Sequence, residues 1–297
     1  MKVIEVDHIT KDYGNQKGVF DVSFFVNKGE VVGFLGPNGA GKTTTIRQLM
    51  GFLHPDEGKV SILGMDCFEQ ASTIQKSLGY LPGEITFMDD MTGLEFLHFI
   101  AKMKKMKDFS YAENLMSYFE LDPKGKIKKM SKGMKQKIGI ACAFMNQPDI
   151  LILDEPTSGL DPLMQNKFVE LILEEKKRGA TILMSSHLFE EVEKTCDRAV
   201  IIKEGKIMED AQIEKLKHNR KKVYEITFAS REMATQFLEN TSYKEAEVSE
   251  NVITISMSSS TDQFIKSLAT YEILDLNVKT QSLEELFMTF YGGKNND

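Results

Sequence analysis

The residues best suited to chemistry form one short loop, Gly36-Pro37-Asn38-Gly39-Ala40-Gly41-Lys42-Thr43-Thr44. Their order fits the phosphate-loop pattern of Gly, four residues and then Gly-Lys-Ser/Thr. Glycines let backbone N–H groups wrap a polyphosphate, Lys42 supplies a positive charge to the outer phosphates, and the Thr43 hydroxyl can ligate Mg2+. The apolar run 30–35 predicts a buried strand before the loop, and 43–50 predicts a helix that ends at Gly51. The helix N-terminus then points at the phosphates, so the sequence indicates a nucleotide-binding site.

A second set of candidates follows the apolar run 150–153, where Asp154 and Glu155 stand together. Such a run is typical of a central parallel strand, which delivers its last residues to the edge of the sheet where ligands bind. Asp154 would hold Mg2+ directly or through water, and Glu155 would activate the attacking water as general base. The alternative is an acidic strand end without chemistry, and the phosphate loop in the same chain argues against it.

The composition narrows the class of protein. The chain has 297 residues, of which 41% are hydrophobic and 27% charged, which suits a globular protein of one large and one small domain. The net charge of −7 argues against broad nucleic-acid binding, and we expect no nucleic-acid partner. No apolar run approaches the ~20 residues that cross a bilayer, and residues 1–10 lack a signal-peptide core. Cys67, Cys142 and Cys196 show no metal-like spacing, so we expect reduced thiols in the cytoplasm.

Strand-like and helical segments alternate along residues 1–214 and predict an α/β domain with a largely parallel sheet. A helical subdomain is expected over about 85–148. The basic stretch 215–222 loses the apolar periodicity and is expected to be a linker. Residues 223–297 follow the order βαββαβ and then a final helix over 283–291, which predicts a small α+β, ferredoxin-like accessory domain.

A third motif stands before the strand that carries Asp154, and it reads Met130-Ser131-Lys132-Gly133-Met134-Lys135-Gln136. With the other two motifs in this order and spacing, residues 1–211 resemble the ATPase subunit of ATP-binding cassette (ABC) transporters. The resemblance implies a P-loop NTPase fold with an N-terminal antiparallel β part. It also implies that Ser131 and Gly133, at a helix N-terminus, bind the γ-phosphate of the ATP held by the other protomer. The working unit would be a head-to-tail homodimer, or a heterodimer with a paralogue, with two ATP molecules between the protomers.

The remaining parts of the family pattern fall in register. The segment 158–161 resembles the loop that communicates across the dimer, and His187 resembles the switch histidine that reaches the γ-phosphate. Tyr13 matches the aromatic residue that stacks on adenine. A structural histidine and ordinary packing of Tyr13 are the alternatives from the residues alone. ATP and Mg2+ are the cofactors that the resemblance implies.

Two positions depart from the family pattern. Gly83, followed by Glu84, stands where the family usually has a Gln that senses Mg2+ and faces the transmembrane partner. Lys132 and Met134 replace the first Gly and the Gln of the usual Ser-Gly-Gly-Gln. Both changes resemble those in ATPases that pair with a separately encoded export permease. That subgroup also carries a C-terminal extension with a Ser-Leu-Glu-Glu-Leu-Phe stretch, which residues 282–287 match.

These observations predict an ATP hydrolase that powers an ABC transporter. It would export a drug, an antibiotic peptide or another small substrate, while bound to the inner face of the cell membrane through an integral-membrane permease. The alternative is a soluble ABC-type ATPase of translation or DNA repair, but those usually carry two cassettes or a long coiled-coil insertion. A GTPase is a further alternative, since 122–125 fits a GTPase pattern, but the guanine-reading Asn-Lys-x-Asp is missing.

Overall fold

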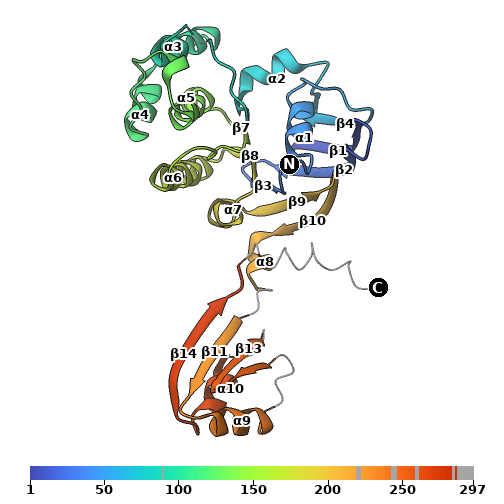
Figure 1. The fold of residues 1–297 in the computed structure, drawn as a ribbon. Coiled ribbons are helices and arrows are strands. Elements are labelled where there is room, and N and C mark those ends of the chain that lie inside the picture. Colours follow the sequence, from blue (N-terminus) through green and yellow to red (C-terminus); the bar gives the residue numbers. More distant parts are fainter. Residues whose placement is uncertain (89, 219–221, 242–245, 258–260, 283–284, 286–297) are drawn as a thin grey trace. The chain divides into compact units, whose positions relative to one another are not determined.

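The computed structural model describes residues 1–297 except 89, 219–221, 242–245, 258–260, 283–284 and 286–297 (Figure 1). The chain forms two compact units, Met1–Ile213 and Glu214–Asp297. The final helix expected over 283–291 lies outside the described residues except for Glu285. Among the residues that are described, no helix combines the length and apolar character of a membrane span.

The centre of the first unit is a six-stranded sheet in the order β10-β9-β3-β8-β7-β6. Its strands are β3 (Val31–Leu35), β6 (Leu78–Leu81), β7 (Ile150–Asp154), β8 (Thr181–Ser186), β9 (Arg198–Lys203) and β10 (Lys206–Gln212). All neighbours pair in parallel except β10, which returns antiparallel to β9. The central strands are buried along their whole length, as sheets covered on both faces require.

A second, antiparallel sheet of the order β2-β1-β4-β5 belongs to the same unit. Its strands are β1 (Lys2–Asp12), β2 (Gly18–Asn27), β4 (Glu57–Ile62) and β5 (Met65–Asp66). The helix α1 (Lys42–Leu49) shares one hydrophobic core with both sheets. The rings of Phe24 and Phe34, one from each sheet, stack with their centroids 5.1 Å apart. Ile46 of α1 is fully buried in this core, so the helix behind the phosphate loop is firmly anchored.

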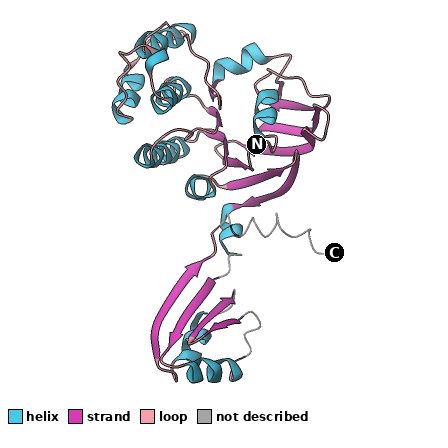
Figure 2. Cartoon of the chain, viewed as in Figure 1, coloured by secondary structure: helices cyan, strands magenta, loops and turns pink. Residues whose placement is uncertain are grey.

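Helices dominate the chain between β6 and β7, as the cyan segments of Figure 2 show. They are α3 (Gly93–Met103), α4 (Ser110–Tyr118), the 3-10 turn η1 (Ile127–Lys129) and α5 (Lys132–Phe144). Thr92 and Glu95 form a capping box at the start of α3. Ser131 caps α5 through a hydrogen bond from the Met134 N–H, so the third motif opens this helix.

The other helices of this unit connect strands of the central sheet or follow it. They are α2 (Ala71–Ser77), α6 (Pro162–Arg178), α7 (Phe189–Thr195) and, at the boundary of the units, α8 (Ile213–His218). Asp161 caps α6, and Gly179 ends it in the left-handed conformation. The helix α7 packs closely on β3, because a Cβ added at Gly33 would lie 2.5 Å from Val192 Cγ1.

The second unit follows the element order β, α, β, β, α, β. Its elements are β11 (Lys222–Phe228), α9 (Arg231–Glu239), β12 (Ala246–Ser249), β13 (Val252–Met257), α10 (Thr261–Leu268) and β14 (Ile273–Thr280). The sheet order β12-β13-β11-β14, with all pairs antiparallel, is that of a ferredoxin-like domain. Its own core includes Tyr224, Phe228, Phe237 and Phe264. Part of the stretch 215–222, expected as a linker, belongs to α8, where Leu216 is buried.

Candidate active site

The phosphate loop connects β3 to α1 and is fixed by its own backbone. Its segment from Pro37 to Ala40, which includes Asn38 and Gly39, is closed by the Ala40 N–H donating to the Pro37 carbonyl. Gly41 is the N-cap of α1 at φ 111°, a conformation that favours glycine. No side chain accepts a hydrogen bond at this cap, so the first N–H groups of α1, including that of Thr44, can serve an anion.

Lys42 is buried, with 5% of its surface exposed, and its ammonium group lies inside the loop. Its Nζ donates to the Gly36 carbonyl at 2.6 Å and lies 3.0 Å from Glu155 Oε1. Lys42 Nζ and Glu155 Oε1 therefore form an ion pair. Among the described residues, this oxygen accepts no hydrogen bond. The structure thus brings together the two residues that the sequence places 113 positions apart, since 155 − 42 = 113.

The two expected metal ligands are in direct contact. Thr43 Oγ1 donates to Asp154 Oδ2 at 2.9 Å, and Ser185 Oγ donates to Asp154 Oδ1 at 2.5 Å. Asp154 is fully buried, whereas Thr43 is exposed. One carboxylate and one hydroxyl are a donor set that fits Mg2+, which takes few protein ligands and completes its shell with water and substrate phosphates. Across the described ranges, no cluster of three or more His, Cys, Asp or Glu side chains suits a metal.

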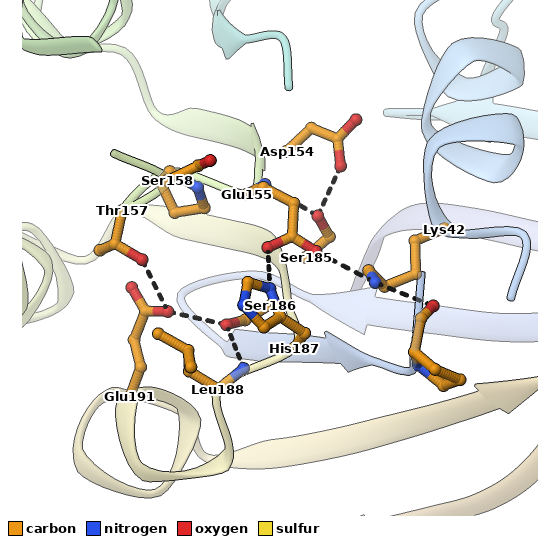
Figure 3. Close-up of polar contacts among 12 residues, drawn as sticks. Lys42, Asp154, Glu155, Thr157, Ser158, Ser185, Ser186, His187, Leu188 and Glu191 are labelled. Atoms are coloured by element: carbon orange, nitrogen blue, oxygen red, sulfur yellow. Dashed lines mark hydrogen bonds and ion pairs between the residues drawn. The ribbon is translucent and has the colours of Figure 1, made fainter. Parts of the chain in front are cut away.

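Glu155 lies between Lys42 and His187, as Figure 3 shows. Its Oε2 lies 2.6 Å from His187 Nδ1, and its side chain is 19% exposed. The backbone of Glu155 is left-handed at φ 48°, an uncommon conformation that costs of order 1–3 kcal/mol for a non-glycine residue. Ser185 stabilises it by accepting the Glu155 N–H at 2.9 Å. Gln136 of α5 supports the same turn by donating to the Pro156 carbonyl at 2.7 Å.

Lys132 and Gly133, which follow Ser131, lie against the loop 158–161 of the same chain. A Cβ added at Gly133 would lie 2.8 Å from the Gly159 carbonyl oxygen, and Lys132 Nζ donates to Ser158 Oγ at 2.9 Å. Within the part of the chain that the structure describes, no hydrogen bond or ion pair joins Ser131 or Gly133 to residues 36–44. The described residues therefore show no direct polar contact between these two predicted residues and the phosphate loop of their own chain.

Two further predicted positions are Tyr13 and Gly83. Tyr13 is 55% exposed in the turn between β1 and β2, and its N–H donates to the Lys17 carbonyl. The start of β2 approaches the phosphate loop, because a Cβ added at Gly41 would lie 3.3 Å from the Gly18 carbonyl oxygen. Gly83 lies directly beside the carboxylate of Asp154, the expected metal ligand, since a Cβ there would lie 3.0 Å from Asp154 Oδ2. The next residue, Glu84, is exposed.

Sequence reasoning assigned no role to four polar residues that hold the site. They are Gln136, Thr157, Ser185 and Glu191. Ser185 could have been found, because it is a polar residue at the end of an apolar strand, next to the predicted His187. Glu191 gave no such signal, since it stands among charged residues of a short helix.

Comparisons with known proteins agree with this geometry. The ABC transporter family model matches residues 19–158. The bacitracin transport ATP-binding protein BcrA of Bacillus licheniformis is 36% identical over 240 residues, which cover 80% of this chain and 78% of that protein. A BcrA of Enterococcus faecalis is 30% identical over 298 residues and covers 98% of this chain and 97% of its own length. The ABC transporter ATP-binding protein NatA of Bacillus subtilis (strain 168) is 38% identical, over 67% of this chain and 84% of that protein.

Solved structures show the same architecture. An ATP-binding subunit of an ABC transporter is 33% identical with a TM-score of 0.66, over 72% of this chain and 92% of that chain. The dimeric structure of a bacterial ABC transporter cassette has a TM-score of 0.64 over 71% of this chain and 98% of that chain, at 22% identity. The second likeness concerns the fold alone. Together they confirm the P-loop fold that the sequence predicted for the first unit.

Proposed function

The chain belongs to the ATP-binding subunits of ABC transporters, and from this premise we propose that it powers export of a small substrate through a separate membrane permease. As a member of this family the chain binds and hydrolyses ATP. The observation that carries the proposed mechanism is the position of Glu155, between Lys42 of the phosphate loop and His187. A carboxylate held there can meet both the γ-phosphate and the water that attacks it.

Each side chain of the site has one role in the proposed reaction. The loop N–H groups and Lys42 hold the β- and γ-phosphates of ATP. Glu155 accepts the proton of the attacking water, and His187 orients the Glu155 carboxylate from the opposite side to Lys42. Thr43 and Asp154 would hold Mg2+, which when bound neutralises charge on the phosphates. Tyr13, in the turn that precedes β2, would stack on the adenine ring.

A second copy of the chain, or a paralogue, completes the site in this proposal. Ser131 and Gly133 stand at the N-terminus of α5, where the helix dipole and free N–H groups favour an anion. The described residues show no polar contact between them and the phosphate loop of their own chain, which supports a role at the ATP of a head-to-tail partner. A dimeric cassette among the structures of this fold supports such a pairing.

The direction of transport and the place of work are proposed from the relatives. BcrA proteins of two species carry names of bacitracin transport, and the one from Enterococcus faecalis matches this chain over both of its units. We therefore favour export of an antibiotic peptide or a similar small substrate. The subunit would be attached to the inner face of the cell membrane by the permease, and Gly83 with the exposed Glu84 would lie near that contact.

Replacement of Glu155 by Gln tests the mechanism. The amide keeps the size of the side chain but cannot accept a proton, so kcat should fall about 10²–10⁴-fold while ATP still binds. The measurement is steady-state phosphate release, with ATP affinity determined separately. Glu190→Gln is the matched control, because Glu190 is exposed on α7 and paired with Lys194. Near-wild-type turnover in Glu155→Gln contradicts the proposal.

Co-purification of an integral-membrane protein with the tagged chain tests the proposed attachment to a permease.

A further inference from the structure

Glu191 is a buried carboxyl group that the mechanism above does not use. It lies on α7 and is only 6% exposed. Its Oε2 accepts hydrogen bonds from Ser186 Oγ at 2.8 Å and from Thr157 Oγ1 at 3.3 Å. Its Oε1 is buried and accepts no hydrogen bond from the residues that the structure describes. The carboxyl group therefore collects two hydroxyl groups on a single oxygen (Figure 3).

The two hydroxyl donors flank the two catalytic side chains. Ser186 directly precedes His187, and its Oγ also accepts a hydrogen bond from the Leu188 N–H at 2.9 Å. This hydroxyl group therefore links the residues before and after the histidine. Thr157 follows Glu155 by two residues, in the turn closed by the Ser158 N–H and the Glu155 carbonyl. Glu191 is thus the common acceptor of the segment that carries His187 and the segment that carries Glu155.

The burial of this carboxyl group is costly. Burial raises the pKa of Glu191 to about 7, because the charged form loses its hydration, and the nearby Glu155 carboxylate adds to the effect. Within the described ranges, no lysine or arginine forms an ion pair with Glu191. An apolar side chain of similar volume would avoid the loss of hydration. Stability alone therefore does not explain a carboxyl group at this position. Its function as acceptor for the hydroxyl groups of Ser186 and Thr157 does explain it.

We propose that Glu191 is a positioning residue for ATP hydrolysis. It holds His187 and the turn after Glu155 in the relative position that places His187 Nδ1 2.6 Å from Glu155 Oε2. It acts through Ser186 and Thr157 and does not touch the substrate. The inference rests on the roles proposed above for Glu155 and His187. It predicts that the hydrogen-bond acceptor at position 191 matters for the rate of the chemical step and not for ATP binding.

The test compares two variants of the full-length protein. Glu191→Leu keeps a similar volume but removes the hydrogen-bond acceptor, so the side chains of His187 and Glu155 shift relative to each other. A displacement of about 1 Å in an active site can cost about 10²-fold in rate, and we expect kcat to fall about 10- to 100-fold. The KM for ATP should change less than about threefold, because Lys42 and the phosphate loop are untouched. Glu191→Gln restores an acceptor and should recover at least about tenfold of the lost kcat. Glu190→Leu, on the exposed face of the same helix, is the matched control.

Three results would overturn the inference. They are a folded Glu191→Leu protein with kcat within about threefold of the wild type, a KM that rises in proportion to the fall in kcat, and a Gln variant as slow as the Leu variant. If Glu191→Leu does not fold, Ser186→Ala removes the donor and should lower kcat about tenfold at constant KM; an unchanged kcat overturns the inference equally. Glu155→Gln is assayed in parallel. If that variant remains active, the proposed function itself fails. If it is inactive, the variants at position 191 test only the positioning role of Glu191.

Discussion

The buried carboxyl group of Glu191 should make the stability of the protein depend on pH in a way that one substitution removes. Its pKa is about 7 in the folded protein against an ordinary value of 4.5. Between these values the folded chain holds a proton that the unfolded chain has released. The contribution to stability is therefore fully present below pH 4.5 and is lost as the pH rises through 7. Glu191→Gln has no such proton, so it lacks this particular loss of stability with rising pH.

The size of the effect follows from the two pKa values. Linkage gives a loss of about 2–3 kcal/mol in the free energy of unfolding of the wild type, relative to the Gln variant, between about pH 5 and about pH 8. The Gln amide adds a constant term. Its NH2 group would occupy the place of Oε1, which finds no hydrogen-bond partner among the described residues, and an unsatisfied buried donor costs about 1–3 kcal/mol at every pH. The slope with pH, and not the difference at one pH, is thus the decisive quantity.

Urea unfolding of both full-length proteins at several pH values measures this slope. The chain has no tryptophan, so far-UV circular dichroism is the suitable signal. Because the chain has two units, the transition to compare is the one that ATP shifts, since ligand binding stabilises the unit that holds the site. Glu190→Gln is the control: a hydrogen bond from Lys194 lowers the pKa of this exposed group, so its titration lies in the acid range. A difference between Glu191→Gln and wild type that stays constant from pH 5 to pH 8 would refute the reasoning.

Two further predictions concern the partner copy and the second unit. Ser131→Ala should weaken ATP-dependent dimerisation in the slow Glu155→Gln background while nucleotide binding to the monomer is kept; light scattering that shows the same dimer would contradict the role in trans. A chain that ends after His218 keeps the whole first unit and should bind ATP like the full-length protein. A calorimetric titration of that shortened chain without ATP binding would show that the first unit depends on the second.

The local parts of the site could be predicted from the sequence because each depends on neighbouring residues. The phosphate loop is a backbone shape that its glycines permit, and the apolar run before Asp154 indicates a buried strand wherever it lies. The start of α5 follows from the capping residue Ser131. The edge strand β10 could not be predicted in this way, because its half-buried positions include the charged Glu209 as well as Ile207 and Ala211 and give no apolar alternation.

Contacts between distant segments could not be predicted in the same way. Ser185 donates to Asp154 and accepts from the Glu155 N–H only because β8 lies beside β7 in parallel register, with Asp154 opposite Ser185. The sequence places these residues 31 and 30 positions apart and contains no sign of the strand order. The left-handed backbone of Glu155 is also a consequence of that neighbour, which holds a conformation that an isolated turn would rarely adopt.

Glu191 illustrates how packing gives a charged residue a role that its own segment does not suggest. Its neighbours on α7 include Glu190 and Lys194, which are exposed and paired with each other, so the helix resembles a solvated surface. The absence of a side chain at Gly33 allows Val192 to approach β3 closely, and the preceding residue is carried inward with it. The carboxyl group then meets the ends of two segments that leave the sheet at its catalytic edge. Close packing of α7 on β3 and burial of Glu191 thus occur together, and neither can be seen in the helix segment alone.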